Sequence, residues 1–180
     1  MPGIVFNETI QDAHHFKENV YKKDVRFNMA DVVSLNPNIH AFLKNNNIPC
    51  LSSSDILSEN YYRVILDKCL ILEGVVSSYF KNMSEIPDYY LNTVMYYLIL
   101  IWRHFLWNIE LVYQTLKRKE YKFISAYMHE EIQTDSPWIE DDQLYLGGIV
   151  QKFAYHRKCK FIPLNYNQIK LDKNKGSQCG

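Results

Sequence analysis

The chain has 180 residues, of which 47% are hydrophobic. This length and composition suffice for one domain with a sizeable core, and they exclude a disordered or fibrous chain. The 20 Lys and Arg residues balance the 20 Asp and Glu residues. Since no net positive charge attracts a phosphate backbone, we expect no nucleic-acid partner.

Strands and helices alternate in the first third of the predicted structure. Asn36 can cap a helix while Pro37 takes its first position, where the missing N–H costs nothing. That helix ends in Asn45-Asn46-Asn47. Two strands joined by so short a helix should pair in parallel. The apolar runs predict strands at residues 4–6, 31–35 and 48–51, with a further helix at about 11–23.

The middle third is predicted to be a helical hairpin. Apolar residues recur every three or four positions from about Glu59 to Lys81, and again from the linker 82–88 to about Leu116. Two long helices joined by a short turn are typical of an antiparallel pair. The uncharged run from Val94 to Trp102 is about half of the ~20 residues that a spanning helix needs. It predicts a buried helix, and we expect no transmembrane segment.

The last third repeats the alternation. A strand is predicted at 122–128, a helix whose buried stripe runs from Leu146 to Ala154, and a strand at 160–164. The whole order predicts an α/β fold with a mostly parallel, Rossmann-like sheet flanked by helices and a long central helical hairpin. We expect one domain over residues 1–164 and a polar tail, or the start of a linker, over 165–180.

Several kinds of chemistry have no motif in this chain. There is no glycine-rich phosphate loop and no GxSxG motif, and the four cysteines stand far apart. We therefore expect no cofactor, no metal and a cytoplasmic protein with reduced thiols. Two basic stretches, Lys117–Lys119 and His156–Lys160, fall where helices should end. There their charges complement the helix dipole, which explains them better than a binding surface does.

The loop after the strand 122–128 is the strongest candidate site. Ligands of open parallel sheets bind at the carboxyl ends of the strands. This loop combines an imidazole, carboxylates and a helix start, and its candidates are His129, Glu130, Asp135, Ser136 and Trp138. The alternative is that the acidic residues only cap the following helix.

Two further polar clusters follow the strands 31–35 and 48–51. The first contains Ser34, Asn36 and Asn38, and the second contains Ser52, Ser53, Ser54 and Asp55. Serine hydroxyls can bind a phosphate or a sugar hydroxyl. The same residues also serve as helix caps, and that interpretation is favoured for both clusters.

The order of elements resembles a known family. Asp31 to Leu57 contains an apolar strand, Asn-Pro, a short helix and a strand that ends in Ser-Ser-Asp. This segment resembles the N-terminal half of GT-B-like glycosyltransferases and of bacterial surface-carbohydrate biosynthesis proteins. The stretches Tyr121 to Met128, Ser136 to Ile139 and Leu144 to Phe161 are similar to the second half of that domain.

The resemblance implies an acceptor-side domain for surface-polysaccharide biosynthesis that is incomplete alone. It would bind a sugar acceptor or a nucleotide sugar and need a second domain or a protein partner. His129, or a carboxylate among Glu130, Glu131 and Asp135, would be the base that takes a proton from an acceptor hydroxyl. The other hypothesis is a non-catalytic interaction module that docks a protein through the aromatic hairpin, Tyr61 to Trp107.

Overall fold

The computed structural model describes residues 2–81, 87–128 and 146–166. They form two compact units, residues 2–56 with 112–128 and 146–166, and residues 57–81 with 87–111. The first unit is an α/β layer structure around a five-stranded, all-parallel sheet in the order β3-β2-β1-β4-β5. The α/β fold with a parallel sheet, expected from the alternating pattern, is confirmed. The single-domain boundary at residue 164 stays a prediction.

The sheet has β1 (Gly3–Asn7) at its centre, between β2 (Asp31–Ser34) and β4 (Phe123–Tyr127). All residues of β1 and β4 are buried, as expected for strands with helices on both faces. The edges are β3 (Cys50–Ser52) and β5 (Lys160–Leu164). Pro163 lies in β5, where an edge strand tolerates the loss of one N–H donor.

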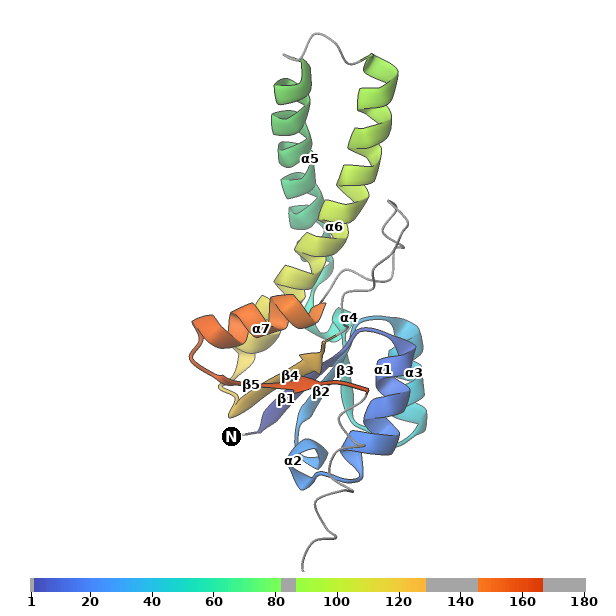
Figure 1. Cartoon of the computed structure of the whole chain (residues 1–180), viewed down its shortest axis with the longest axis vertical. Coiled ribbons are helices and arrows are strands. Elements are labelled where there is room, and N and C mark those ends of the chain that lie inside the picture. Colours follow the sequence, from blue (N-terminus) through green and yellow to red (C-terminus); the bar gives the residue numbers. More distant parts are fainter. Residues whose placement is uncertain (1, 82–86, 129–145, 167–180) are drawn as a thin grey trace, which may run out of the picture. The chain divides into compact units, whose positions relative to one another are not determined.

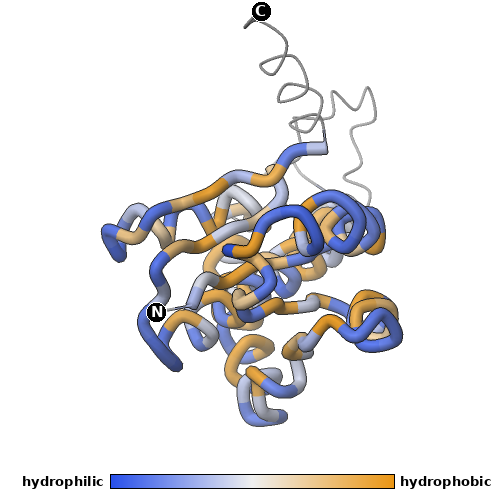
Figure 2. Tube along the Cα trace, turned by 90° about the horizontal axis from the view of Figure 1, so that it is seen from below, coloured by the Kyte–Doolittle hydropathy of each residue, from blue (hydrophilic) through white to orange (hydrophobic). Residues whose placement is uncertain are grey.

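Helices of the first unit cover both faces of the sheet (Figure 1). One face carries α1 (Ile10–His15), the π-helical segment η1 (Phe16–Tyr21) that continues it, and α3 (Pro37–Asn45). The other face carries α7 (Leu146–His156). Figure 2 shows that the strands between these layers consist largely of hydrophobic residues. The main core on the α1 side contains Val5, Val32, Phe123 and Tyr127 from the strands and Ala13, Phe16, Ile39 and Leu43 from the helices.

Two short helices were not among the predicted elements. The first, α2 (Val25–Asn28), is capped by the side chain of Asp24, which accepts a hydrogen bond from the amide of Arg26. The second, α4 (Ser53–Ile56), directly follows β3. Each spans only four residues, too few for a helical period to stand out in the sequence.

The second unit contains α5 (Glu59–Lys81) and most of α6 (Asp88–Arg118), which form the expected helical pair. The ring of Tyr62 on α5 contacts Trp107 on α6 edge to face, with 6.4 Å between the centroids. The guanidinium of Arg103 lies 5.0 Å from the centre of the Tyr62 ring. Among the described residues, none of the helices combines the length and the hydrophobicity that spanning a bilayer requires.

Gly147 sets how closely α7 approaches the end of β4. A β-carbon at this position would lie 2.2 Å from the backbone oxygen of Tyr127, which cannot move without disturbing the sheet. At Gly148, the next residue, a β-carbon would meet nothing within 4 Å. Close packing against β4 thus explains the glycine at position 147 but not the one at position 148.

These two glycines should respond oppositely to alanine. Gly147→Ala should lower the free energy of unfolding by more than ~1 kcal/mol, because overpacking typically costs 1–3 kcal/mol. Gly148→Ala should raise it by about 0.5–1 kcal/mol, because alanine is the better helix former. Urea denaturation of both variants provides the measurement. Equal effects of the two substitutions would contradict this account of the α7–β4 contact.

Candidate functional site

Five residues proposed from the sequence lie outside the described part of the chain. His129, Glu130, Asp135, Ser136 and Trp138 all belong to the stretch 129–145, which follows β4. Their roles as base and as substrate contacts remain predictions.

Asn36 is described, and its side chain caps α3. Its amide oxygen accepts a hydrogen bond from the backbone N–H of Ile39 at 3.0 Å, and Pro37 takes the first helical position. Such a bond satisfies one of the amide groups that a helix leaves unpaired at its start. The capping role expected from the sequence is confirmed, and a substrate contact by Asn36 stays a prediction.

Ser52 ends β3 and caps α4. Its hydroxyl donates to a carboxylate oxygen of Asp55 at 2.7 Å and accepts from the amide of Asp55 at 3.2 Å, while its own amide donates to the same carboxylate at 2.8 Å. These reciprocal bonds form a capping box. They also lower the pKa of Asp55, because the Ser52 hydroxyl stabilises the charged carboxylate. Ser53 is the first residue of α4, and its binding role likewise stays a prediction.

The carboxyl end of β1 carries a buried amide that has no hydrogen-bond partner in the described part of the chain. Asn7 is fully buried, and among the described residues neither its side-chain oxygen nor its side-chain nitrogen has a hydrogen-bond partner. An unpaired buried polar group costs about 1–3 kcal/mol. β1 lies where the chain turns from one half of the sheet to the other, since β2 and β3 lie on one side of it and β4 and β5 on the other. Ligands of open α/β sheets bind outside the strand ends at this switch point.

Polar side chains form a row across the same end of the sheet. Asn7 is paired in register with Ser34, and Ser34 with Ser52. On the other side, Phe6 is paired with Ala126, so Tyr127 comes next to Asn7. The Ser34 hydroxyl donates to the backbone oxygen of Leu51 at 3.1 Å. Ser52, Ser34, Asn7 and Tyr127 therefore occupy neighbouring positions on four adjacent strands.

A buried carboxyl group supports the loop that follows Asn7. Asp12 is fully buried in α1, and its carboxylate accepts bonds from the backbone N–H groups of Glu8 at 3.1 Å and Thr9 at 2.8 Å. Tyr166, beyond β5, donates its hydroxyl to the other carboxylate oxygen. Burial and this bond to Asp12 both raise the pKa of Tyr166, in that order of importance. The network holds the start of α1 beside the end of β1.

Glu8 links the same loop to α7. Its two carboxylate oxygens accept bonds from the backbone N–H of Leu146, the first residue of α7, at 3.1 and 3.3 Å. A carboxylate at the start of a helix is favoured by the helix dipole. The end of β1 is thus connected to helices on both faces of the sheet. Two carboxyl groups lie near it, that of Glu8 in the following loop and that of Asp12 in α1.

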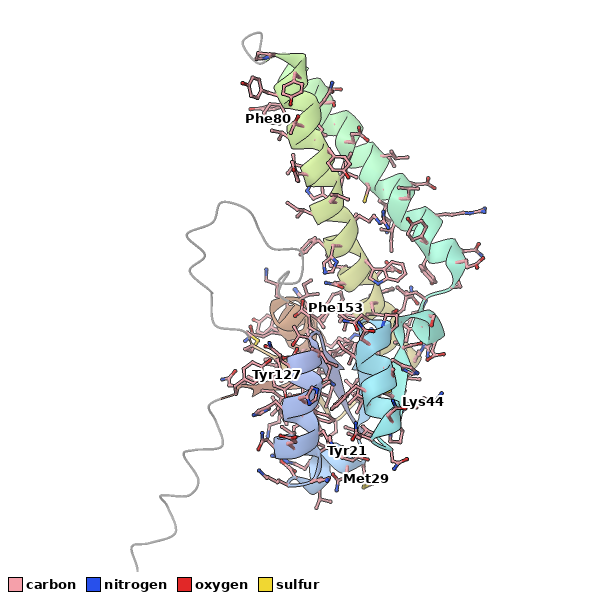
Figure 3. All side chains as sticks on the ribbon, turned by 90° about the vertical axis from the view of Figure 1, so that its right-hand side faces the viewer. Tyr21, Met29, Lys44, Phe80, Tyr127 and Phe153 are labelled. Atoms are coloured by element: carbon pink, nitrogen blue, oxygen red, sulfur yellow. The ribbon has the colours of Figure 1, made fainter. Side chains whose placement is uncertain are left out.

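His15 and Tyr127 form a second contact between α1 and the sheet. The His15 Nδ1 atom and the Tyr127 hydroxyl lie 2.9 Å apart. Tyr127, at the end of β4, is buried (Figure 3). Burial raises the pKa of Tyr127, and the Asp12 charge adds to this effect. Burial also lowers the pKa of His15 below its ordinary value of 6.5, while Asp12 acts against that shift.

Cys50 of β3 lies beside His40 of α3, but its surroundings do not favour the nucleophilic thiolate form. The Cys50 Sγ atom and the His40 Nδ1 atom lie 3.3 Å apart, and the Ser34 hydroxyl lies 3.4 Å from the same nitrogen. Burial raises the pKa of Cys50, whereas a nucleophilic cysteine requires a lowered one. Among the described residues, no group of three or more His, Cys, Asp or Glu side chains is placed to hold a metal ion.

Sequence reasoning overlooked the residues at the end of β1. The strand 4–6 was expected, and Asn-Glu-Thr directly follows its core. The rule that ranked His129 applies equally to this segment. What the sequence did not reveal is that β1 lies at the centre of the sheet, because strand order depends on contacts between distant segments.

The chain was compared with protein-family models, with curated proteins and with solved structures, and none of the three comparisons gave a match. The structure establishes a five-stranded parallel α/β architecture. The resemblance to glycosyltransferases stays a hypothesis.

The lowered pKa of His15 predicts an acid-sensitive fold. The folded protein binds a proton at His15 less readily than the unfolded chain does, so protonation favours unfolding. The free energy of unfolding should fall as the pH drops below about 6.5. His15→Gln, which keeps a polar group beside Tyr127, should flatten this dependence in urea denaturation between pH 7.5 and 5.

His14→Gln is the matched control. It removes the neighbouring imidazole and leaves the His15–Tyr127 pair intact. The His14 ring packs against Phe42 instead, with 4.0 Å between the ring centroids. The His15 part of the pH dependence should persist in this variant. A wild-type slope in His15→Gln would contradict the assignment.

Proposed function

We propose that this chain is the acceptor-side domain of a glycosyltransferase of surface-polysaccharide biosynthesis. In this proposal it binds an acceptor sugar at the carboxyl end of β1, and a second domain or a partner protein supplies the donor. The observation that carries the proposal is the buried amide of Asn7 at the switch point of the parallel sheet, which is unpaired among the residues that the structure describes. A side-chain amide can donate to one sugar hydroxyl and accept from another.

The surrounding groups favour a neutral, hydroxyl-rich ligand. Ser34 and Tyr127 flank Asn7 in the sheet, and their hydroxyls are bonded within the protein, so the amide of Asn7 is the polar group offered to a ligand. Glu8 and Asp12 place two carboxyl groups near the end of β1, and their negative charge repels phosphate. These features support an acceptor sugar, and not a nucleotide sugar, as the ligand at the carboxyl end of β1. His129, or one of the carboxylates Glu130 and Asp135, remains the proposed base.

Asn7→Leu separates binding from stability. Leucine fills a similar space without polar atoms, so this variant should be more stable than the wild type by about 1 kcal/mol or more. Neutral saccharides such as N-acetylglucosamine and lactose should shift the amide NMR signals of residues 7–9 in the wild type. In Asn7→Leu the affinity should fall at least about tenfold, as when a site built for a hydroxyl loses its partner.

Asn108→Leu is the matched control. Asn108 in α6 is the other described residue with a buried and unpartnered amide. Its replacement should stabilise the protein similarly and leave saccharide binding unchanged. The proposal fails if no saccharide shifts the signals of residues 7–9, or if Asn7→Leu binds as the wild type does.

A second candidate function is protein interaction through α5 and α6. Side chains project from both helices along their length (Figure 3). Many of those on the described part are apolar or aromatic and solvent-exposed: Ile71, Val75, Tyr79, Tyr89, Tyr90 and Tyr96 are each more than 60% exposed. Exposed apolar patches of this kind mark interaction surfaces. A second copy of the chain is the occupant that can be tested directly, because the same surface is present on each copy.

This second function predicts concentration-dependent self-association in analytical ultracentrifugation. The double variant Ile71→Lys/Val75→Lys should weaken it at least about tenfold, since burying an unpaired charge opposes docking. Glu73→Lys, a charge change on the opposite face of the same helix from Ile71 and Val75, is the control and should leave association within a few-fold of the wild type. A monomer at all concentrations would reject pairing between copies.

A further inference from the structure

A basic pocket lies at the opposite, amino-terminal end of the sheet. Its volume is about 430 Å³. Three segments line it: the end of α6 with the connection to β4, the start of β4, and the turn between α7 and β5. All three belong to the first unit.

Five cationic residues line this pocket, against one acidic residue. The cations are Lys119, Lys122, Arg157, Lys158 and Lys160, and the carboxylate is Glu120. Within the described part of the chain, Lys119 is the only one of the five that forms an ion pair, with Asp31. Four uncompensated cations in one concave site produce a positive local field even though the whole chain is neutral.

Hydrogen bonds fix the walls of the pocket to each other. Arg157 donates from Nη1 to the backbone oxygen of Leu116 in α6 at 2.8 Å. The Cys159 thiol donates to the backbone oxygen of Tyr121 at 3.2 Å, and burial raises the pKa of this thiol, which keeps it protonated as a donor. The two basic stretches, almost 40 residues apart in the sequence, are thereby held at one site.

Lys158 occupies a backbone conformation that disfavours lysine. Its φ is 53°, and the bonds from Lys158 N to Tyr155 O and from Cys159 N to Ala154 O show that it ends α7 in a Schellman motif. Glycine is the usual residue there. The corresponding position after α3 is Asn47, with a φ of 57°, and asparagine tolerates this region well. At this position the chain places a cation in the pocket lining, although glycine would fit the backbone better.

We propose that this pocket binds a phosphate group. A phosphate presents several acceptor oxygens and up to two negative charges, which match lysine ammonium groups and the remaining N–H donors of Arg157. The group can belong to a soluble phosphate ester or to a lipid headgroup. The site is independent of the proposed saccharide site, because it lies at the other end of the strands and shares no residue with it.

Pyrophosphate is the soluble probe. In the full chain it should shift the amide NMR signals of residues 119–122 and 157–160, with an affinity that weakens as salt rises. The double variant Lys122→Gln/Lys158→Gly should bind at least about tenfold more weakly, since each lost charge-assisted contact contributes several-fold. Citrate, an anion without phosphate, should bind more weakly than pyrophosphate.

The single variant Lys158→Gly tests whether a loss of pyrophosphate binding is caused by misfolding. Glycine suits the left-handed conformation, so this substitution should raise the melting temperature while it weakens pyrophosphate binding. Asn47→Gly makes the corresponding change away from the pocket, and Lys44→Gln removes an exposed cation from α3. Both controls should bind pyrophosphate as the wild type does.

Vesicles distinguish the two sources of phosphate. Phosphatidylcholine vesicles with and without phosphatidic acid are used in flotation experiments. Binding to phosphatidic acid that exceeds binding to pyrophosphate and is lost in the double variant identifies a lipid headgroup. Binding to pyrophosphate alone identifies a soluble ester. The proposal is overturned if neither probe binds, if citrate competes equally, or if the double variant binds both probes as the wild type does.

Discussion

The central position of β1 is the constraint on which the rest of the first unit depends. A strand paired in parallel on both sides needs helical crossovers, and these cover both faces of the sheet. Its residues must therefore be apolar, and Gly3–Asn7 meets this requirement until its last residue. Asn7 breaks the apolar pattern at the point where the two halves of the sheet diverge. The same pairing that buries β1 thus brings an amide, hydroxyls and carboxyl groups to one end of the sheet.

Local patterns in the sequence were enough to predict most of the fold. The helix expected from Glu59 to Lys81 and the strand at 160–164 have the observed boundaries. Long periodic stripes and the Asn36-Pro37 start leave little ambiguity. The short helices α2 and α4 were not predicted, because four residues are too few to show a helical repeat of apolar positions. The π-helical geometry of η1 has no sequence signature of its own. Of the candidate site, Asn36 and Ser52 were found together with their capping roles, whereas Asn7 was missed.

The basic residues illustrate why charge patterns are hard to interpret along a chain. Each stretch, taken alone, has an adequate explanation as the end of a helix, and α6 does end at Arg118. Only the pairing of β4 with β5 places Lys160 beside Phe123 and so unites the two stretches. The first unit therefore has carboxyl groups near the end of β1 and cations around the start of β4. This separation of charge within a neutral chain depends on the tertiary structure and not on composition.

The two edge strands have a consequence for how the protein behaves at high concentration. An open sheet edge offers unpaired N–H and C=O groups onto which another polypeptide can add a strand. Here β3 is three residues long, and β5 contains Pro163, which has no N–H to offer. Both edges are poor templates for intermolecular strand addition, so the parallel sheet is protected from the uncontrolled polymerisation that leads to amyloid.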